Sequence, residues 1–114
     1  MAFAAAMALM LPSTAALASP VEISPTRITR LAVQSDGLVF VKVEPSTPTG
    51  GTPASCATNS SWQLTFHATD AAGQAMLAAA LSAKASGSQV GIVTAGTCTH
   101  FPFIEDARLI DILP

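Results

Sequence analysis

Charged residues are scarce in this sequence. Five Lys and Arg residues and seven Asp and Glu residues make up 11% of the 114-residue chain, and the formal net charge is −2. Nucleic acids and anionic membrane surfaces attract proteins through clusters of basic side chains. The charge balance therefore argues against both as partners, and we expect neither.

Catalytic and metal-binding motifs are also missing. There is no C-x-x-C or H-x₃-H spacing for zinc, and no glycine pattern of a nucleophile elbow. His67 and His100 would form a four-ligand zinc site only together with the two cysteines, which is the weaker interpretation. We interpret Glu105-Asp106 as a solvated turn before the last strand rather than as a catalytic carboxylate pair. The sequence thus predicts a protein that is not an enzyme, with no catalytic or metal-binding residue and no cofactor.

The first eighteen residues contain no charge at all. Their apolar run is broken at Pro12-Ser13, and Ala16-Leu17-Ala18 forms a small-residue cleavage pattern before Ser19. Because the run is too short to span a bilayer, it is typical of a signal peptide. We predict a signal peptide over 1–18, a single mature domain over 19–114, and a secreted or periplasmic protein that is not attached to a membrane after cleavage. A disordered, alanine-rich arm is the alternative.

The chain has only two cysteines, Cys56 and Cys98. In an exported protein this number favours a disulfide over a metal or redox site. The residues between them read as a strand over 62–67, a helix, and a strand over 90–94. A disulfide requires Cα atoms within about 7 Å, so pairing would make these strands antiparallel, with the helix turning the chain at their far end.

The remaining strands are predicted from alternation and turn residues. Residues 27–33 and 38–43 should form a hairpin through the turn Ser35-Asp36-Gly37, with Leu31 and Val33 facing inward. One face of the return strand carries Val39, Val41 and Val43, and the other carries Leu38, Phe40 and Lys42. Residues 44–61 form a long loop rich in proline and glycine, and 107–113 supply the last strand.

The helix should begin after an N-cap at Thr69 and end at Gly87. Its apolar stripe is predicted to cap the core and consists of Met76, Leu77, Ala80 and Leu81, with Lys84 at its end. Trp62, Leu64 and Phe66 occupy alternate positions, which predicts that all three side chains pack in the core.

The element order is strand, strand, strand, helix, strand, strand. This is the order of a five-stranded OB-fold barrel, so we predict a mainly β protein with one helix and one disulfide.

Several short segments resemble the B subunits of AB5 toxins of the subtilase-cytotoxin type. They are Ile28-Thr29-Arg30 before Ser35-Asp36-Gly37, Cys56-Ala57-Thr58 ahead of Trp62, Ala72-Gly73-Gln74-Ala75-Met76, and Gly96-Thr97-Cys98. The resemblance covers most of residues 27–113. It implies an OB-type barrel and glycan recognition, but no sugar-binding residue of the toxins has a counterpart motif here.

Two functional hypotheses follow. The first is a non-catalytic binding module that recognises a glycan or another protein and forms a homo-oligomer, as a toxin B subunit does. OB-folds bind ligands on the face of the second and third strands and on neighbouring loops. The alternative is a structural or inhibitory envelope protein that acts through protein–protein contacts. The candidate ligand residues are Ser35, Asp36, His100, Phe101 and Phe103.

Overall fold

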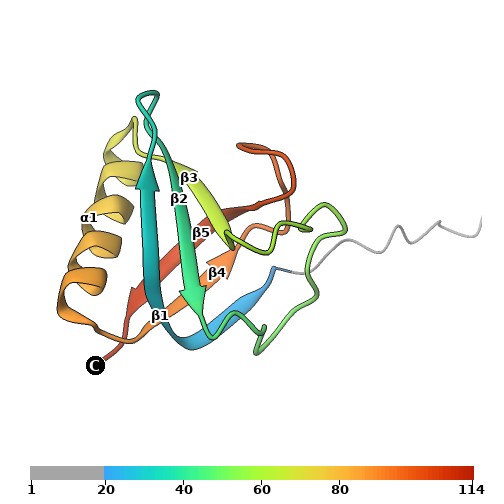
Figure 1. Ribbon diagram of the computed structural model, residues 1–114, viewed down its shortest axis with the longest axis horizontal. Helices are drawn as coiled ribbons and strands as arrows, with labels where there is room; N and C mark the ends of the chain where they lie inside the picture. The colour runs from blue at the N-terminus through green and yellow to red at the C-terminus, as the bar shows by residue number, and fades with distance from the viewer. Residues whose placement is uncertain (1–19) are drawn as a thin grey trace, which may run out of the picture.

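The structure, a computed structural model, describes residues 20–114, and the predicted signal peptide lies outside the described residues. The elements follow the predicted order (Figure 1). They are β1 (Glu22–Val33), β2 (Leu38–Glu44), β3 (Leu64–His67), α1 (Ala71–Ser86), β4 (Val90–Thr94) and β5 (Glu105–Ile112). β1 begins five residues before the predicted strand, because the segment read as an extended lead-in pairs with β4.

The five strands close into a ring in the order β1-β2-β3-β5-β4. All neighbouring pairs are antiparallel except β3 and β5, which are parallel. β1 belongs to both halves of the ring, since its first part pairs with β4 and its second part with β2. This topology confirms the predicted OB-fold barrel.

The interior of the barrel is filled by alternating apolar side chains. Val39, Val41 and Val43 of β2 are fully buried together with Leu64 of β3 and Ile92 of β4. The grouping of Val39, Val41 and Val43 on one face of β2 is therefore confirmed, and the structure shows that this face points inward. Burying each such side chain contributes about 1.5–3 kcal/mol, so this cluster is the main source of stability.

Of the two residues of β1 that were predicted to face inward, the structure confirms only one. Leu31 packs against the barrel core as expected. Val33, however, is 52% exposed. It is the last residue of the strand, next to a β1–β2 hairpin that extends beyond the rest of the barrel (Figure 1).

The hairpin has a three-residue loop, as the turn residues indicate. Gln34 N donates to Leu38 O at 2.8 Å, and Gly37 N donates to Gln34 O at 3.0 Å. Gly37 has φ 88°, the left-handed conformation that follows a type I turn in such loops. Asp36 contributes to the turn through its Oδ1, which accepts a hydrogen bond from Leu38 N.

A second apolar cluster lies on the outer side of the β1–β2–β3 strands. Its buried members are Leu38, Phe40 and Ile104, and Trp62 and Phe101 pack against it. The core packing predicted for Trp62 is confirmed, but it is against this second cluster and not in the barrel interior. β3 begins only at Leu64, so the alternation does not extend back to Trp62.

Helix α1 contacts the barrel with small residues. Gly73, Ala80 and Ala83 are its buried positions, and Met76 and Leu77 also pack against the core. Leu81 is 49% exposed, so its predicted place in the inward stripe is wrong. The exposed Lys84 likewise lies off the buried face.

The orientation of the helix follows from a close backbone contact between its start and the end of β3. A Cβ added to Gly73 would lie 1.9 Å from His67 O. This contact excludes a side chain at position 73 and turns the face with Gly73, Ala80 and Ala83 toward the barrel. Asp70 caps the helix by accepting a hydrogen bond from Gly73 N, so the cap predicted at Thr69 is wrong by one residue. Gly87 ends the helix as predicted, with φ 66°.

Candidate functional site

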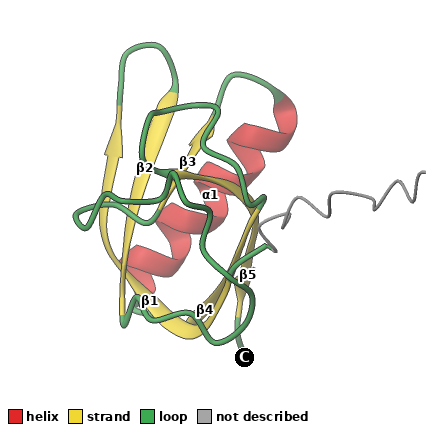
Figure 2. Ribbon diagram, turned by 90° about the vertical axis from the view of Figure 1, so that its right-hand side faces the viewer, coloured by secondary structure: helices red, strands yellow, loops and turns green. Residues whose placement is uncertain are grey.

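Two loops on one side of the barrel form the candidate site (Figure 2). They are the β2–β3 loop (residues 45–63) and the β4–β5 loop (residues 95–104). The predicted disulfide is confirmed and joins them, with the Cα atoms of Cys56 and Cys98 6.3 Å apart. The thiols are therefore unavailable as metal ligands, and the four-ligand zinc interpretation is wrong.

Glu105 fastens the β2–β3 loop to the barrel. It is buried at the start of β5, and its Oε1 accepts a hydrogen bond from Ala54 N at 2.8 Å. The prediction that Glu105-Asp106 form a solvated turn is wrong, since both side chains are buried within β5. Buried carboxylates need hydrogen-bond donors, and here the two loops supply them.

Asp106 holds the β4–β5 loop in the same way. Its side chain is 5% exposed. The hydroxyl groups of Thr97 and Thr99 each donate to Oδ2 at 2.6 Å. The backbone N–H groups of Thr99 and His100 each donate to Oδ1 at 3.0 Å. One carboxylate thus fixes the four consecutive residues that include Cys98.

These donors also affect the charge of Asp106. Burial alone would raise the pKa of Asp106, but the hydrogen bonds from Thr97, Thr99 and His100 outweigh it and lower the pKa. A lowered pKa stabilises the fold above the pKa of the unfolded chain, about 3.9, and this contribution is lost as the pH falls below that value.

We expect Asp106→Asn to lower the free energy of unfolding at pH 7 by about 1–3 kcal/mol, because an amide cannot accept all these hydrogen bonds. The difference from the wild-type protein should shrink as the pH falls below the unfolded-state pKa of about 3.9 and toward the lowered pKa of folded Asp106. Urea unfolding at pH 7 and pH 3 measures both effects. Asp111→Asn, an exposed change in the same strand, is the control. A difference that does not change with pH would contradict the prediction.

The β4–β5 loop ends in a turn that presents two aromatic side chains. Ile104 N donates to Phe101 O, and Pro102 and Phe103 occupy the central positions. Phe103 has φ 69°, a conformation in which glycine or asparagine is usual. Its side chain is nevertheless 60% exposed, so burial does not compensate for the strain.

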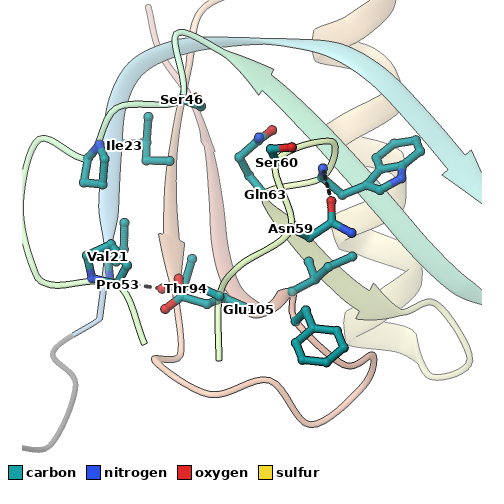
Figure 3. Close-up of a pocket in the computed structure, with 14 residues that line it drawn as sticks. Val21, Ile23, Ser46, Pro53, Asn59, Ser60, Gln63, Thr94 and Glu105 are labelled. Carbon is teal, nitrogen blue, oxygen red and sulfur yellow. Dashed lines mark hydrogen bonds between the residues drawn. The ribbon is translucent and has the colours of Figure 1, made fainter. Parts of the chain in front are cut away.

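A cavity of about 240 Å³, here the loop cavity, lies between the β2–β3 loop and the end of the barrel. Figure 3 shows Val21 and Thr94 on one wall and Asn59, Ser60 and Gln63 on the opposite wall. The loop cavity therefore has one wall from the barrel and one rich in amide and hydroxyl groups.

A second cavity of about 360 Å³, the aromatic cavity, is lined by Phe40, Trp62 and Phe101 and by the end of β1. The Phe40 ring centroid lies 5.6 Å from that of Trp62 and 5.0 Å from that of Phe101. The Arg30 guanidinium lies 4.8 Å from the centroid of Trp62. Asn59 and Trp62 line both cavities, which therefore meet at these two residues.

The two side-chain amides of the loop cavity have donors to spare. Asn59 Oδ1 accepts hydrogen bonds from Ser61 N and Trp62 N, and Gln63 Oε1 accepts one from Val43 N at 2.7 Å. The oxygen atoms thus support the backbone of the site. Within residues 20–114 neither NH₂ group has an acceptor, so both remain able to donate to a ligand.

The structure brings together only some of the five candidate ligand residues that were predicted from the sequence. Phe101 lines the aromatic cavity and Phe103 the loop cavity. Ser35 and Asp36 lie in the exposed hairpin and line neither cavity. His100 also lies outside both, where its ring packs against that of His67.

Sequence reasoning missed Asn59, Gln63 and Glu105 as members of the site. The turn-forming character of Asn59 before Ser61 and Trp62 was the available signal, since asparagine side chains commonly bond to backbone two or three residues ahead. Nothing comparable marked Gln63 or Glu105, whose partners lie far away along the chain.

Residues 20–114 hold no group of three or more His, Cys, Asp and Glu side chains placed to bind a metal. In the same part of the chain, no helix has the length and apolar character needed to cross a membrane. A disulfide is typical of an oxidising compartment outside the cytosol. Comparison with protein families, with curated proteins and with solved structures finds no match to this chain.

Proposed function

We propose that this protein is a secreted, non-catalytic module that binds a neutral oligosaccharide across the loop cavity and the aromatic cavity. The observation that carries the proposal is the meeting of the two cavities at Trp62 and Asn59, where an aromatic ring adjoins unpaired amide donors. A sugar ring presents an apolar face and a rim of hydroxyl groups, so it needs both kinds of group together.

The polar groups of the loop cavity suit hydroxyl ligands. Asn59 and Gln63 offer NH₂ donors, and Ser46 and Ser60 add hydroxyl groups that both donate and accept. Among residues 20–114, the one ionisable residue lining the two cavities is Glu105, and its Oε1 already accepts a hydrogen bond from Ala54 N. The scarcity of charge on these walls favours an uncharged ligand.

The size of the site favours more than one sugar ring. The two cavities measure about 240 and 360 Å³. Together they reach the range of roughly 300–1,000 Å³ that is usual for small-molecule sites. Since Trp62 stands where they meet, a chain of two or more sugars would place one ring on each side of it.

Phe103 gives independent support. A non-glycine residue held at positive φ costs about 1–3 kcal/mol, and such strain clusters at binding sites. Here the strained residue exposes most of its aromatic ring beside the loop cavity. The resemblance to toxin B subunits also supports glycan recognition, and it extends the proposal to a homo-oligomer, which native mass spectrometry would test.

Phe103→Gly separates binding from folding. We expect it to preserve or raise stability, because glycine adopts φ 69° without strain, while weakening oligosaccharide binding about tenfold through the loss of ring contact. A glycan array of neutral oligosaccharides would identify a ligand, and calorimetry would compare the variant with wild type.

Leu109→Ala is the matched control, since Leu109 is also exposed and apolar but lines neither cavity. Unchanged affinity in both variants would place the ligand elsewhere. If no glycan binds but Phe103→Gly abolishes a contact with an envelope protein, the structural or inhibitory alternative is correct.

A further inference from the structure

His67 and His100, the two histidines of the chain, meet beside the candidate site. Their ring centroids are 4.7 Å apart and their planes are perpendicular. His67 is half-buried and His100 is exposed, so this is not a pair enclosed in the core. Within residues 20–114 no ring nitrogen of either residue has a hydrogen-bond partner.

Both backbones are held in place by other interactions. His67 is the last residue of β3 and pairs with Leu38 of β2. His100 donates its backbone N–H to Asp106 Oδ1, and Cys98, two residues earlier, is tied to Cys56. The two imidazoles therefore meet edge to face, each on a backbone that other interactions hold in place.

We propose that His67 and His100 together bind a divalent transition-metal ion that fastens the β4–β5 loop to β3. This inference does not depend on the proposed glycan function, because metal binding is measured without a glycan.

The separation of the rings fits a shared ion. Two imidazoles with metal–nitrogen distances of about 2.0–2.1 Å and a tetrahedral angle between them place their ring centroids roughly 5 Å apart. The observed 4.7 Å is close to this value. Binding of a shared ion requires the rings to rotate out of this edge-to-face arrangement, which the broad outer torsion of histidine allows.

The available ligand set limits which ions would bind. With the cysteines joined, the protein supplies two imidazole nitrogens, and water completes the coordination sphere. Imidazole suits Zn²⁺, Ni²⁺ and Cu²⁺, whereas Mg²⁺ and Ca²⁺ prefer oxygen ligands. The nearby Asp106 carboxylate adds negative charge, although the loop already occupies its oxygen atoms.

Binding would reinforce the loop that presents Phe101 and Phe103. The disulfide and Asp106 hold this loop at residues 97–100, and the metal would add a bond from the His100 side chain to the barrel. Metal occupancy should thus slow amide hydrogen exchange in residues 95–104.

The experiment uses the disulfide-bonded chain without a histidine tag, titrated with ZnCl₂ and NiCl₂ by calorimetry. We expect one ion per chain, a raised melting temperature, and simultaneous shifts of both histidine ring signals in ¹H–¹⁵N spectra. His67→Gln and His100→Gln should each weaken binding by about tenfold or more, because each removes half of the protein ligands. The metal affinity of the double variant should be only slightly lower than that of either single variant.

Ser35→Ala, in the neighbouring exposed hairpin, is the control and should bind as the wild type does. His100→Gln is the safer variant for folding, since His100 is exposed and its ring makes no hydrogen bond within the described residues. Affinity within twofold of wild type in either single variant, or shifts of one histidine alone, would overturn the shared site. Stronger binding of MgCl₂ than of ZnCl₂ would overturn it as well.

Discussion

Ala83→Asp is expected to lower the free energy of unfolding by about 4 kcal/mol or more, a large share of the stability of a domain of this size. Ala83 is 1% exposed and belongs to the barrel core. A carboxylate at this position would be buried among apolar side chains without a counter-charge, unless the helix moved away from the barrel.

Leu81→Asp, two residues away on the same helix, is the matched control. Leu81 is half exposed, so the same carboxylate there should change stability by only about 0.5 kcal/mol. Urea unfolding followed by circular dichroism would measure both variants. Equal midpoints would show that α1 does not contact the barrel through Ala83.

The contrast between these residues shows where sequence reasoning about the helix stops. Leu81 is the larger apolar side chain, so hydrophobic periodicity placed it inward. The distance between helix and barrel decides otherwise, because Gly73 lies against His67 O and the helix therefore turns Gly73, Ala80 and Ala83 toward the barrel. Local periodicity carries no information about such a distance.

The strand order and the disulfide were predictable because their signals are local. Alternation marked Val39, Val41 and Val43, turn residues marked the hairpin, and two lone cysteines in a chain predicted to be exported implied their pairing. These signals are sufficient to predict the OB-fold, because few topologies are compatible with both this element order and the Cys56–Cys98 disulfide.

The site depends on contacts over long distances in the sequence. Glu105 bonds the backbone of Ala54, 51 residues earlier. Charged residues are seldom buried, so a solvated turn was the expected state of Glu105 and Asp106. The two cavities also depend on the conformation of the β2–β3 loop, whose proline and glycine residues restrict local turns but not the path of the whole loop.

Replacing both cysteines, Cys56→Ala with Cys98→Ala, is expected to lower the free energy of unfolding by about 2–5 kcal/mol. The bond closes a segment that contains β3, α1 and β4, with a sequence separation of 42 residues. In the chain-entropy model a closure of this length contributes about 4 kcal/mol by restricting the unfolded chain. This is a large share of the stability of a domain of this size.

Guanidinium chloride unfolding of the double variant, with and without dithiothreitol, provides the measurement. The reductant should destabilise the wild-type protein to a similar extent and leave the variant unchanged. The variant should also bind less oligosaccharide, because the disulfide joins the two loops that form the loop cavity. The bond between Glu105 and Ala54 would still anchor the β2–β3 loop, so binding should be weakened rather than abolished. A variant as stable as the wild type under oxidising conditions would show that the barrel holds these loops without the disulfide.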